Sequence, residues 1–255
     1  MIDKLLFQLN DTVQVFRLGI TSNKKIASPN EKIVQSYSFS KLQYQYVHDN
    51  YLAKIKNNFN DFFALDGSNC LTCPLSGNAR KSDGSLKVKC YTHKAFQYMG
   101  FISMLKGIIK KYGEFNNLPI YDNNIDEFKK MSINRFVRFG TYGEPSLHPI
   151  ELVNGISKVC KNWTGYTHQY KNKPLYSTFF MASTHSENQS NKAWNDHKYR
   201  SFISYHDKAL VTAGIIKKAV QCPASKELDV SNCSTCGLCS GTNGKGLKDV
   251  KILLH

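Results

Sequence analysis

The stretch NRFVRFGTYGEPSLHPIELVNGISKVCKNW, residues 134–163, decides the fold. It opens with an apolar run from Phe136 to Phe139 that stops at Gly140, which predicts a buried strand followed by a turn. The segment 148–163 then repeats apolar side chains at helical spacing, which predicts an amphipathic helix. A strand, a turn and a helix in this order are typical of proteins with a parallel sheet.

The same alternation of short apolar runs and helical patterns extends through the chain. One helix is predicted over 94–113, where the apolar period closes at Gly113. Further strands are predicted over 61–65, 165–170, 174–183 and 199–206. We therefore expect an α/β fold, a parallel β/α barrel that is closed or incomplete, with the working loops at the carboxyl ends of its strands.

Three regions are expected along the chain. Residues 1–60 form an N-terminal extension packed on the core, with a strand over 13–21 and a helix over 41–59. Residues 61–221 form the barrel-like core, which carries a first group of cysteines. Residues 222–255 form a C-terminal segment that carries a second group.

Composition limits the class of protein. The chain has 255 residues, 41% of them hydrophobic, which is typical of a folded globular protein. It contains no run of about 18 apolar residues and no secretory signal, so we expect no membrane partner and a cytoplasmic location. The net charge of +15 reflects either a solvated, lysine-rich surface or a polyanionic partner such as nucleic acid.

The C-terminal cysteines have the spacing of an iron–sulfur ligand set. Cys222, Cys233, Cys236 and Cys239 follow the pattern C-x10-C-x2-C-x2-C. A C-x2-C-x2-C run with one distant cysteine is the arrangement used by ferredoxin-type [4Fe–4S] sites. A zinc site is the alternative, although zinc favours two separated C-x2-C pairs.

The first cysteine group contains three members, Cys70, Cys73 and Cys90. A site with three cysteines either leaves one metal position open, as catalysis needs, or is closed by a further ligand. His93, Cys160 or an external molecule could supply that ligand. We expect both cysteine groups at the carboxyl ends of the strands, because ligands bind there in parallel α/β folds.

Several other side chains have a structural as well as a functional interpretation. Glu144 is a candidate site carboxylate or merely a residue of a turn that starts a helix. His148 is a candidate for a packing or capping role, and Cys160 for a small buried side chain on a helix. His168 and His185 lie near strand ends, where surface or hydrogen-bonded histidines are commoner than ligands.

The order of these motifs resembles the radical S-adenosylmethionine (radical SAM) superfamily. In that family three cysteines bind a [4Fe–4S] cluster whose fourth iron is chelated by SAM, and a glycine-rich GGEP turn contacts the SAM amino group. The resemblance implies that SAM, if bound, contacts the turn Tyr142, Gly143, Glu144 and Pro145. The usual spacing is C-x3-C-x2-C, whereas this chain has C-x2-C-x16-C.

A second resemblance covers roughly residues 60–245. The motifs Cys90-Tyr91, 166–169 (YTHQ), 181–183 (MAS) and 222–225 (CPAS) are similar to those of uncharacterised phage and plasmid proteins of the gene-product-88 type. Together the resemblances imply a phage-encoded, radical-SAM-like protein with two [4Fe–4S] clusters and an unknown substrate. The alternative is a non-enzymatic iron–sulfur or zinc protein whose closed sites and basic surface serve nucleic acid or an acidic partner. The sequence identifies no catalytic residue.

Overall fold

The computed structural model describes residues 4–9, 11–51, 59–76, 90, 92, 95–121, 124–205, 219–243 and 248–253. The strands of these residues form two five-stranded sheets. None of the described helices is long and apolar enough to cross a membrane.

The first sheet is mixed, with the strand order β1-β2-β3-β4-β5. Its strands are β1 (Lys4–Leu9), β2 (Thr12–Ile20), β3 (Lys32–Ser40), β4 (Phe136–Tyr142) and β5 (Asn162–Thr164). The pairs β1/β2 and β2/β3 are antiparallel, whereas β3, β4 and β5 are parallel. Three N-terminal strands therefore belong to the same sheet as the strand–turn–helix segment.

The second sheet is parallel in every strand pair that the structure describes. Its order is β6-β7-β8-β10-β9. The strands are β6 (Tyr166–Thr167), β7 (Met181–Thr184), β8 (Ser201–Tyr205), β9 (Val220–Gln221) and β10 (Val250–Leu253).

One residue separates the two sheets, because β5 ends at Thr164 and β6 begins at Tyr166. A side chain on Gly165 would overlap the ring of Phe180, so glycine permits the close packing at this bend. The segment thus pairs first with β4 and then with β7. The described strands form an α/β fold with parallel sheet segments and no closed barrel, which confirms the predicted fold class in its coarser form.

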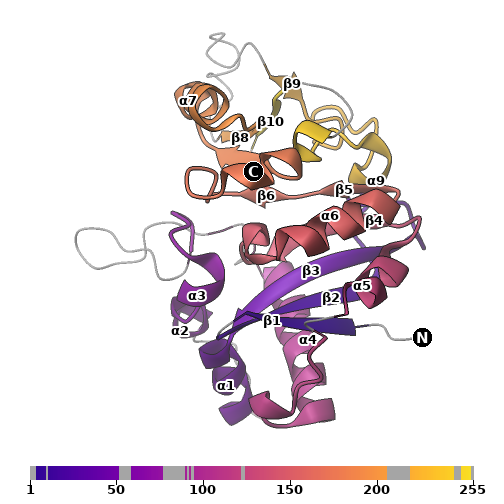
Figure 1. The fold of residues 1–255 in the computed structure, drawn as a ribbon, viewed down its shortest axis with the longest axis vertical. Coiled ribbons are helices and arrows are strands. Elements are labelled where there is room, and N and C mark those ends of the chain that lie inside the picture. The colour runs from indigo at the N-terminus through magenta and orange to yellow at the C-terminus, as the bar shows by residue number, and fades with distance from the viewer. Residues whose placement is uncertain are drawn as a thin grey trace, which may run out of the picture.

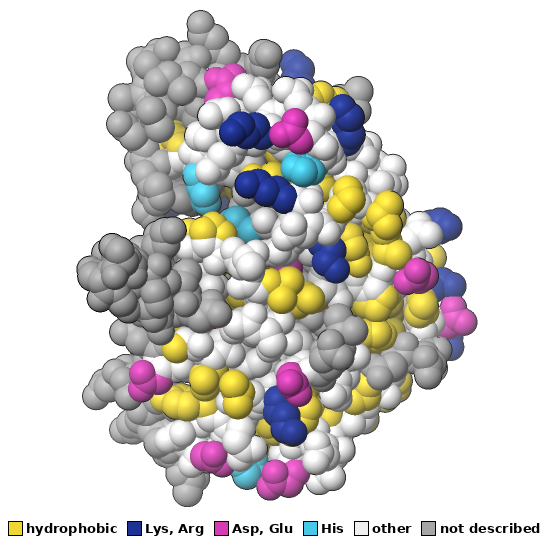
Figure 2. All heavy atoms as spheres, turned by 60° about the vertical axis from the view of Figure 1, so that its left-hand side comes forward, with side chains coloured by type: hydrophobic (Ala, Val, Ile, Leu, Met, Phe, Trp, Pro, Cys, Tyr) yellow, Lys and Arg dark blue, Asp and Glu magenta, His cyan; other side chains and the backbone are white. Residues whose placement is uncertain are grey.

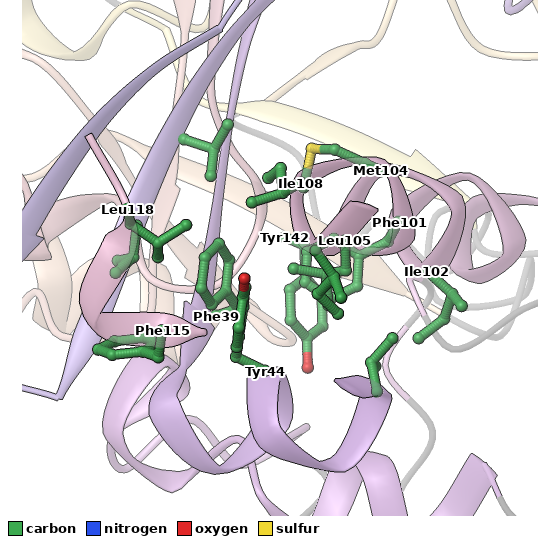
Figure 3. Packing of buried hydrophobic residues seen from close by; sticks show 14 of the residues in the cluster. Phe39, Tyr44, Phe101, Ile102, Met104, Leu105, Ile108, Phe115, Leu118 and Tyr142 are labelled. Atoms are coloured by element: carbon green, nitrogen blue, oxygen red, sulfur yellow. The ribbon is translucent and has the colours of Figure 1, made fainter. Parts of the chain in front are cut away.

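Helices cover both faces of the first sheet (Figure 1). The helices α1 (Lys41–Asp49) and α4 (Ala95–Tyr112) bury aromatic and aliphatic side chains against one face. Figure 3 shows Phe39, Tyr44, Phe101 and Tyr142 gathered in this core. The helices α5 (Ile125–Ser132) and α6 (Ile150–Val159) pack into a second core on the other face.

The remaining elements are short, apart from α7 (Glu187–His197), which packs on β7 and β8. The short α-helices are α2 (Phe59–Ala64), α3 (Gly67–Cys70) and α9 (Cys233–Cys236). The 3-10 helices are η2 (Phe115–Asn117), η3 (Pro145–Leu147), η4 (Pro174–Thr178) and η5 (Gly241–Asn243).

Several local predictions are confirmed. The strand predicted over 13–21 is β2, the helix over 94–113 is α4, and the strand over 199–206 is β8. The helix over 148–163 is α6, although its last residues belong instead to β5. The helix over 41–59 is confirmed as α1 for its first nine residues, and 52–58 lie outside the described residues.

Other local predictions are wrong. Residues 61–64 belong to the helix α2, because Phe62 and Phe63 are both buried against aromatic neighbours, and so short an apolar run carries no period that separates strand from helix. Residues 174–178 form η4, so only the end of the predicted strand 174–183 is a strand. The sequence interpretation did not identify β1 or β10.

A buried arginine ties the C-terminal segment to the second sheet. Arg200, directly before β8, is fully buried, and its Nη1 donates to the carbonyl oxygen of Gly241 at 2.6 Å. Its Nε and Nη2 donate to the carbonyl oxygen of Lys248. The nearby carboxylate of Asp249 balances the charge.

We expect Arg200→Met to lower the free energy of unfolding by about 3 kcal/mol, because two buried carbonyl groups lose their charged donor. Urea denaturation monitored by circular dichroism measures the change. The control Lys192→Met, at an exposed position of α7, should alter stability by no more than about 0.5 kcal/mol. Equal stabilities of the two variants would contradict the role of Arg200.

Candidate metal centres

The first cysteine group lies where α3 ends. Cys70 is the last residue of α3, and its main-chain N–H donates to the carbonyl oxygen of Asp66 at 2.8 Å. The chain turns at Leu71, whose φ is +52°, and Cys73 N–H donates to Cys70 O at 3.1 Å. Thr92 donates its hydroxyl hydrogen to the sulfur of Cys90 at 3.0 Å. The helix α3 and the turn after it thus fix the positions of Cys70 and Cys73.

The Gly-Glu-Pro turn after β4 lies against this cysteine loop. Glu144 N–H donates to the carbonyl oxygen of Asn69 at 2.8 Å, and Asn69 Nδ2 donates to the carbonyl oxygen of Ser38 in β3 at 3.3 Å. The loop before Cys70 is therefore fixed at the carboxyl ends of β3 and β4, as expected for the first group. Whether this turn contacts a cofactor stays a prediction.

Gly143 makes that close approach possible. Its φ is +87°, a region that L side chains rarely adopt, and a Cβ there would overlap Ser38 Oγ and lie 3.2 Å from Asn69 O. Any other residue would push the turn away from both β3 and the cysteine loop.

The carboxylate of Glu144 already has partners in the protein. It is buried and accepts hydrogen bonds from the main-chain N–H groups of Ser146 at 3.0 Å and His168 at 3.3 Å. Burial raises the pKa of Glu144 above its usual range. The structural interpretation of Glu144 as a turn and helix-start residue is confirmed, since it is the N-cap of η3.

The flanking residues of the turn are packed in the core. The ring of Tyr142 lies 4.4 Å from that of Phe101, and its hydroxyl accepts a hydrogen bond from Gln43 at 2.9 Å. Burial raises the pKa of Tyr142, and the nearby Cys70 adds to the shift. Pro145 is buried as the first residue of η3.

A histidine from the second sheet reaches the first cysteine group. His168 follows β6, and its Nδ1 lies 3.3 Å from the sulfur of Cys73. The His168 ring stacks on that of His185 with centroids 5.8 Å apart, and His185 Nδ1 lies 2.7 Å from Ser204 Oγ. The sequence interpretation noted that His168 lies near a strand end but did not connect it with Cys73.

The three thiols of the first group lie in a common, partly buried environment. Burial raises the pKa of Cys73 to about 12, and the charges of Cys90 and Glu144 act in the same direction. Burial also raises the pKa of Cys70, with further contributions from Asp66, Cys73 and Cys90. A group that raises a neighbour's pKa through its own charge lies near it, so Cys70, Cys73 and Cys90 are neighbours in space.

The other proposed ligands and histidines can now be located. Cys160 is the C-cap residue that follows α6. Its sulfur donates to the carbonyl oxygen of Ser157 at 3.7 Å, and its side chain packs beside the second core. It lies two residues before β5, at the end of the sheet away from Cys73, so it is not the fourth ligand. His93 lies outside the described residues. His148 has the structural role considered for it, packed on Phe16 with its Nε2 3.0 Å from Ser36 Oγ.

The four C-terminal cysteines line one cavity. Cys222, Cys233, Cys236 and Cys239 surround a space of about 20 Å³, which is more than the roughly 10–15 Å³ that one water needs. Burial raises the pKa of Cys233 to about 11 and that of Cys239 further still, and Tyr166 donates a hydrogen bond to the sulfur of Cys239. The fourth cysteine therefore returns to the C-x2-C-x2-C run, as its spacing predicts.

Asn162, the first residue of β5, holds the loop that carries these thiols. Its Nδ2 donates to the carbonyl oxygens of Cys233 at 3.3 Å and Ser234 at 3.4 Å. Gly237 has a φ of +70°, and a Cβ there would lie 2.9 Å from Asn162 Nδ2, so glycine is required for this contact. Cys233 N–H also donates to the carbonyl oxygen of Lys25 at 2.9 Å.

The expectation that both cysteine groups lie at the carboxyl ends of the strands is wrong for the second group. Cys233 packs on Phe136, the first residue of β4, and Cys239 packs with Met181 and Val250, the first residues of β7 and β10. The C-terminal loop is fixed to the opposite end because its partners, Asn162 and the 25–27 loop, lie there.

The donor atoms are close together but are not arranged as a finished coordination shell. Among the described residues, no group of three or more His, Cys, Asp or Glu side chains is arranged to hold a metal ion. The chemistry of the donor sets fits a thiophilic metal, since each site gathers several thiols that are buried or partly buried.

No family model, curated protein or solved structure matches this chain. The function must therefore be argued from the residues of the two sites.

Gly143→Ala tests whether the turn must approach β3 this closely. We expect the free energy of unfolding to fall by at least about 2 kcal/mol, because alanine is strained at a φ of +87° and its Cβ overlaps Ser38. Gly107→Ala is the control, since Gly107 lies within α4 with open space around it and alanine should stabilise the helix by up to about 1 kcal/mol. Thermal denaturation of both variants measures the difference, and unchanged stability of Gly143→Ala would contradict the tight turn.

Proposed function

We propose that this chain is an iron–sulfur protein that holds two [4Fe–4S] clusters. One would be bound by Cys222, Cys233, Cys236 and Cys239, and the other by the group around Cys73. The observation that carries the proposal is the single cavity lined by all four C-terminal cysteines, which come from separate stretches of the chain.

The surroundings of the C-terminal site favour a cluster over free thiols. Burial raises the pKa of Cys222, Cys233 and Cys239, so their thiolates would be unstable there without a positive metal centre to compensate their charge. Tyr166 adds a hydrogen bond to Cys239, and such bonds to cluster sulfurs tune a cluster's potential. The C-x2-C-x2-C run favours an iron–sulfur cluster over a zinc ion, and metal analysis distinguishes the two.

The first form of the proposal is a radical-SAM-like enzyme of unknown substrate. It is supported by the place of Cys70 and Cys73 at the carboxyl ends of parallel strands and by the Gly-Glu-Pro turn beside them. A cluster with an open iron would bind SAM and supply an electron to it. In this form the protein would orient SAM with the turn 142–145 and exclude water with the aromatic core behind Tyr142. The resemblance to phage proteins adds a phage origin and the host cytoplasm as the place of action.

The second form is a non-enzymatic iron–sulfur protein with both clusters closed, and two observations favour it. The carboxylate of Glu144 is already bonded to Ser146 and His168, and the imidazole of His168 lies beside Cys73. The net charge of +15 admits a nucleic-acid or acidic partner. On the face in Figure 2, however, the Lys and Arg side chains are scattered among acidic ones and form no single patch.

Metal analysis after anaerobic purification tests the proposal. We expect about eight iron and eight sulfide ions per chain, as two [4Fe–4S] clusters require. Cys73→Ala and Cys236→Ala should each reduce iron by about half, since each removes a ligand of one cluster. Cys160→Ala is the matched control, because Cys160 belongs to neither group and should leave the iron content unchanged. Stoichiometric zinc without iron would refute the iron–sulfur assignment.

Titration of SAM into the reduced protein distinguishes the two forms. In the first form SAM changes the EPR spectrum, and reduction yields 5′-deoxyadenosine. Glu144→Gln should then weaken SAM binding about tenfold with cluster content intact, because a charge-assisted hydrogen bond to the SAM ammonium is lost. If SAM does not change the EPR spectrum and no 5′-deoxyadenosine forms, the first form is excluded and the second form is the one supported.

A further inference from the structure

The C-terminal cysteine site reaches the protein surface along one edge. Cys222 and Cys239 are buried, whereas Cys233 and Cys236 are partly exposed. The two partly exposed cysteines begin and end the short helix α9, and Thr235 between them is exposed. Figure 1 shows α9 next to β5, on the side of the fold away from α3. A second molecule would therefore meet this site at α9.

Basic residues lie around this edge. The carbonyl oxygen of Lys25 accepts a hydrogen bond from Cys233 N–H at 2.9 Å. Lys161 Nζ donates to Ser234 Oγ of α9 at 3.4 Å. Burial raises the pKa of Cys233, and the positive charge of Arg138 opposes that shift, so the guanidinium lies near this thiol. Three cationic residues from separate stretches of the chain thus lie against the cysteine loop.

The segments that build this end of the molecule carry a net positive charge. They contain seven Lys and Arg against three Asp and Glu, counted over the cysteine loop and the stretches beside it, which are 22–32, 135–138, 161 and 222–241. One of the three acidic residues, Glu31, is already paired with Lys161 at 3.5 Å. An acidic partner would therefore be attracted to this end, and a basic partner would be repelled.

Two exposed apolar side chains lie beside the basic residues. Leu228 is 45% exposed and Val230 is 74% exposed. Their loop is fixed to the cysteine site, because Val230 N–H donates to the carbonyl oxygen of Pro223 at 3.0 Å, directly after Cys222. Leu228 N–H donates to the carbonyl oxygen of Ser225 at 3.3 Å. The loop therefore holds both side chains outward next to the site.

The first sheet adds exposed apolar side chains at the same end. Ile20 is the last residue of β2 and pairs with Lys32, the first residue of β3. Ile133 lies three residues before β4 begins. Four of the eight exposed large hydrophobic side chains of the described residues therefore lie at the end to which the cysteine loop is fixed. Exposed apolar side chains with charged residues around them are typical of a protein–protein contact surface.

We propose that this end of the molecule is the docking site of an acidic electron-carrier protein. The docking surface comprises the edge at α9 with Lys25, Arg138, Lys161, Leu228 and Val230. The inference rests on the proposed function, because it needs the C-terminal cluster. In the step, the reduced carrier loses one electron and the oxidised [4Fe–4S] cluster gains it, and no bond forms or breaks.

The docking surface fits a protein better than a nucleic acid. Interfaces with nucleic acids are more polar and much more positively charged than interfaces between proteins. Here Glu227 and Asp229 flank the exposed Leu228, and these acidic groups would repel a phosphate backbone. An apolar side chain such as Val230 gains free energy when another protein covers it, and phosphates offer no such burial.

Calorimetric titration of the anaerobic full chain with an oxidised plant-type ferredoxin, an acidic [2Fe–2S] carrier, tests the docking surface. We expect binding that weakens as salt rises from about 0.05 to about 0.5 M, because salt screens the charges of both proteins. The double variant Lys25→Gln/Lys161→Gln should weaken binding about fivefold, since two attractive charges are lost. Val230→Asp should weaken it about tenfold, because a repelling charge replaces an apolar contact.

Matched controls are Lys110→Gln on α4 and Leu42→Asp on α1, both at exposed positions outside the docking surface. The two controls should bind ferredoxin as tightly as the wild-type chain. All of these variants should keep the wild-type iron content, since none replaces a cysteine and every changed side chain is exposed or partly exposed.

Stopped-flow mixing with reduced ferredoxin gives a second readout. Electron transfer should be slower in the docking-surface variants than in the controls, whereas dithionite should reduce the cluster to the same extent in every variant. An iron-loaded chain that binds no ferredoxin, or binds it equally in docking-surface and control variants, would overturn the inference and leave the iron–sulfur proposal intact. Variants that lose affinity for a single-stranded DNA oligonucleotide but not for ferredoxin would do the same. A wild-type chain without iron would overturn both.

Discussion

The segment from Asn162 to His168 is the element on which the rest of the structure depends. Its first half pairs with β4 and its second half with β7, so one short run of backbone joins both sheets. The residue at the bend is Gly165, and a side chain there would overlap the ring of Phe180. Gly165 alone therefore separates the last strand of the first sheet from the first strand of the second.

The same segment contacts both candidate metal centres. Asn162 holds the loop of the C-terminal cysteines, Tyr166 donates to Cys239, and His168 reaches Cys73. Tyr166 and His168 are two residues apart, which is about 7 Å along a strand. Residues that contact the two candidate metal centres therefore lie only two positions apart in the chain.

The two sites are built by different means. The first is fixed by turns with special backbone conformations, at Leu71 and Gly143, and by a carboxylate that bonds main-chain donors. The second is a loop folded over the starts of several strands and tied down by Asn162 and Arg200. A metal bound at either site would add to stability, because the site is assembled only in the folded chain.

The sequence by itself determined the features that depend on neighbours along the chain. Local patterns predicted the helices α4 and α6 and the turn at Gly143, because the residues concerned are near one another in sequence. The ligand spacing likewise predicted that Cys222 returns to the C-x2-C-x2-C run. The three-cysteine group could likewise be recognised, and its place beside the turn followed from the rule for parallel strands.

Only the tertiary structure decided the contacts between distant segments. His168 and Cys73 are 95 residues apart, and no local pattern connects them. The C-terminal cysteines lie at the opposite end of the strands because Asn162, Lys25 and Phe136 bind and pack the loop there, an outcome of long-range packing. The helix α2 replaced a predicted strand for the same reason, since a short apolar run adopts whichever form buries its aromatic rings against the neighbours that the fold supplies.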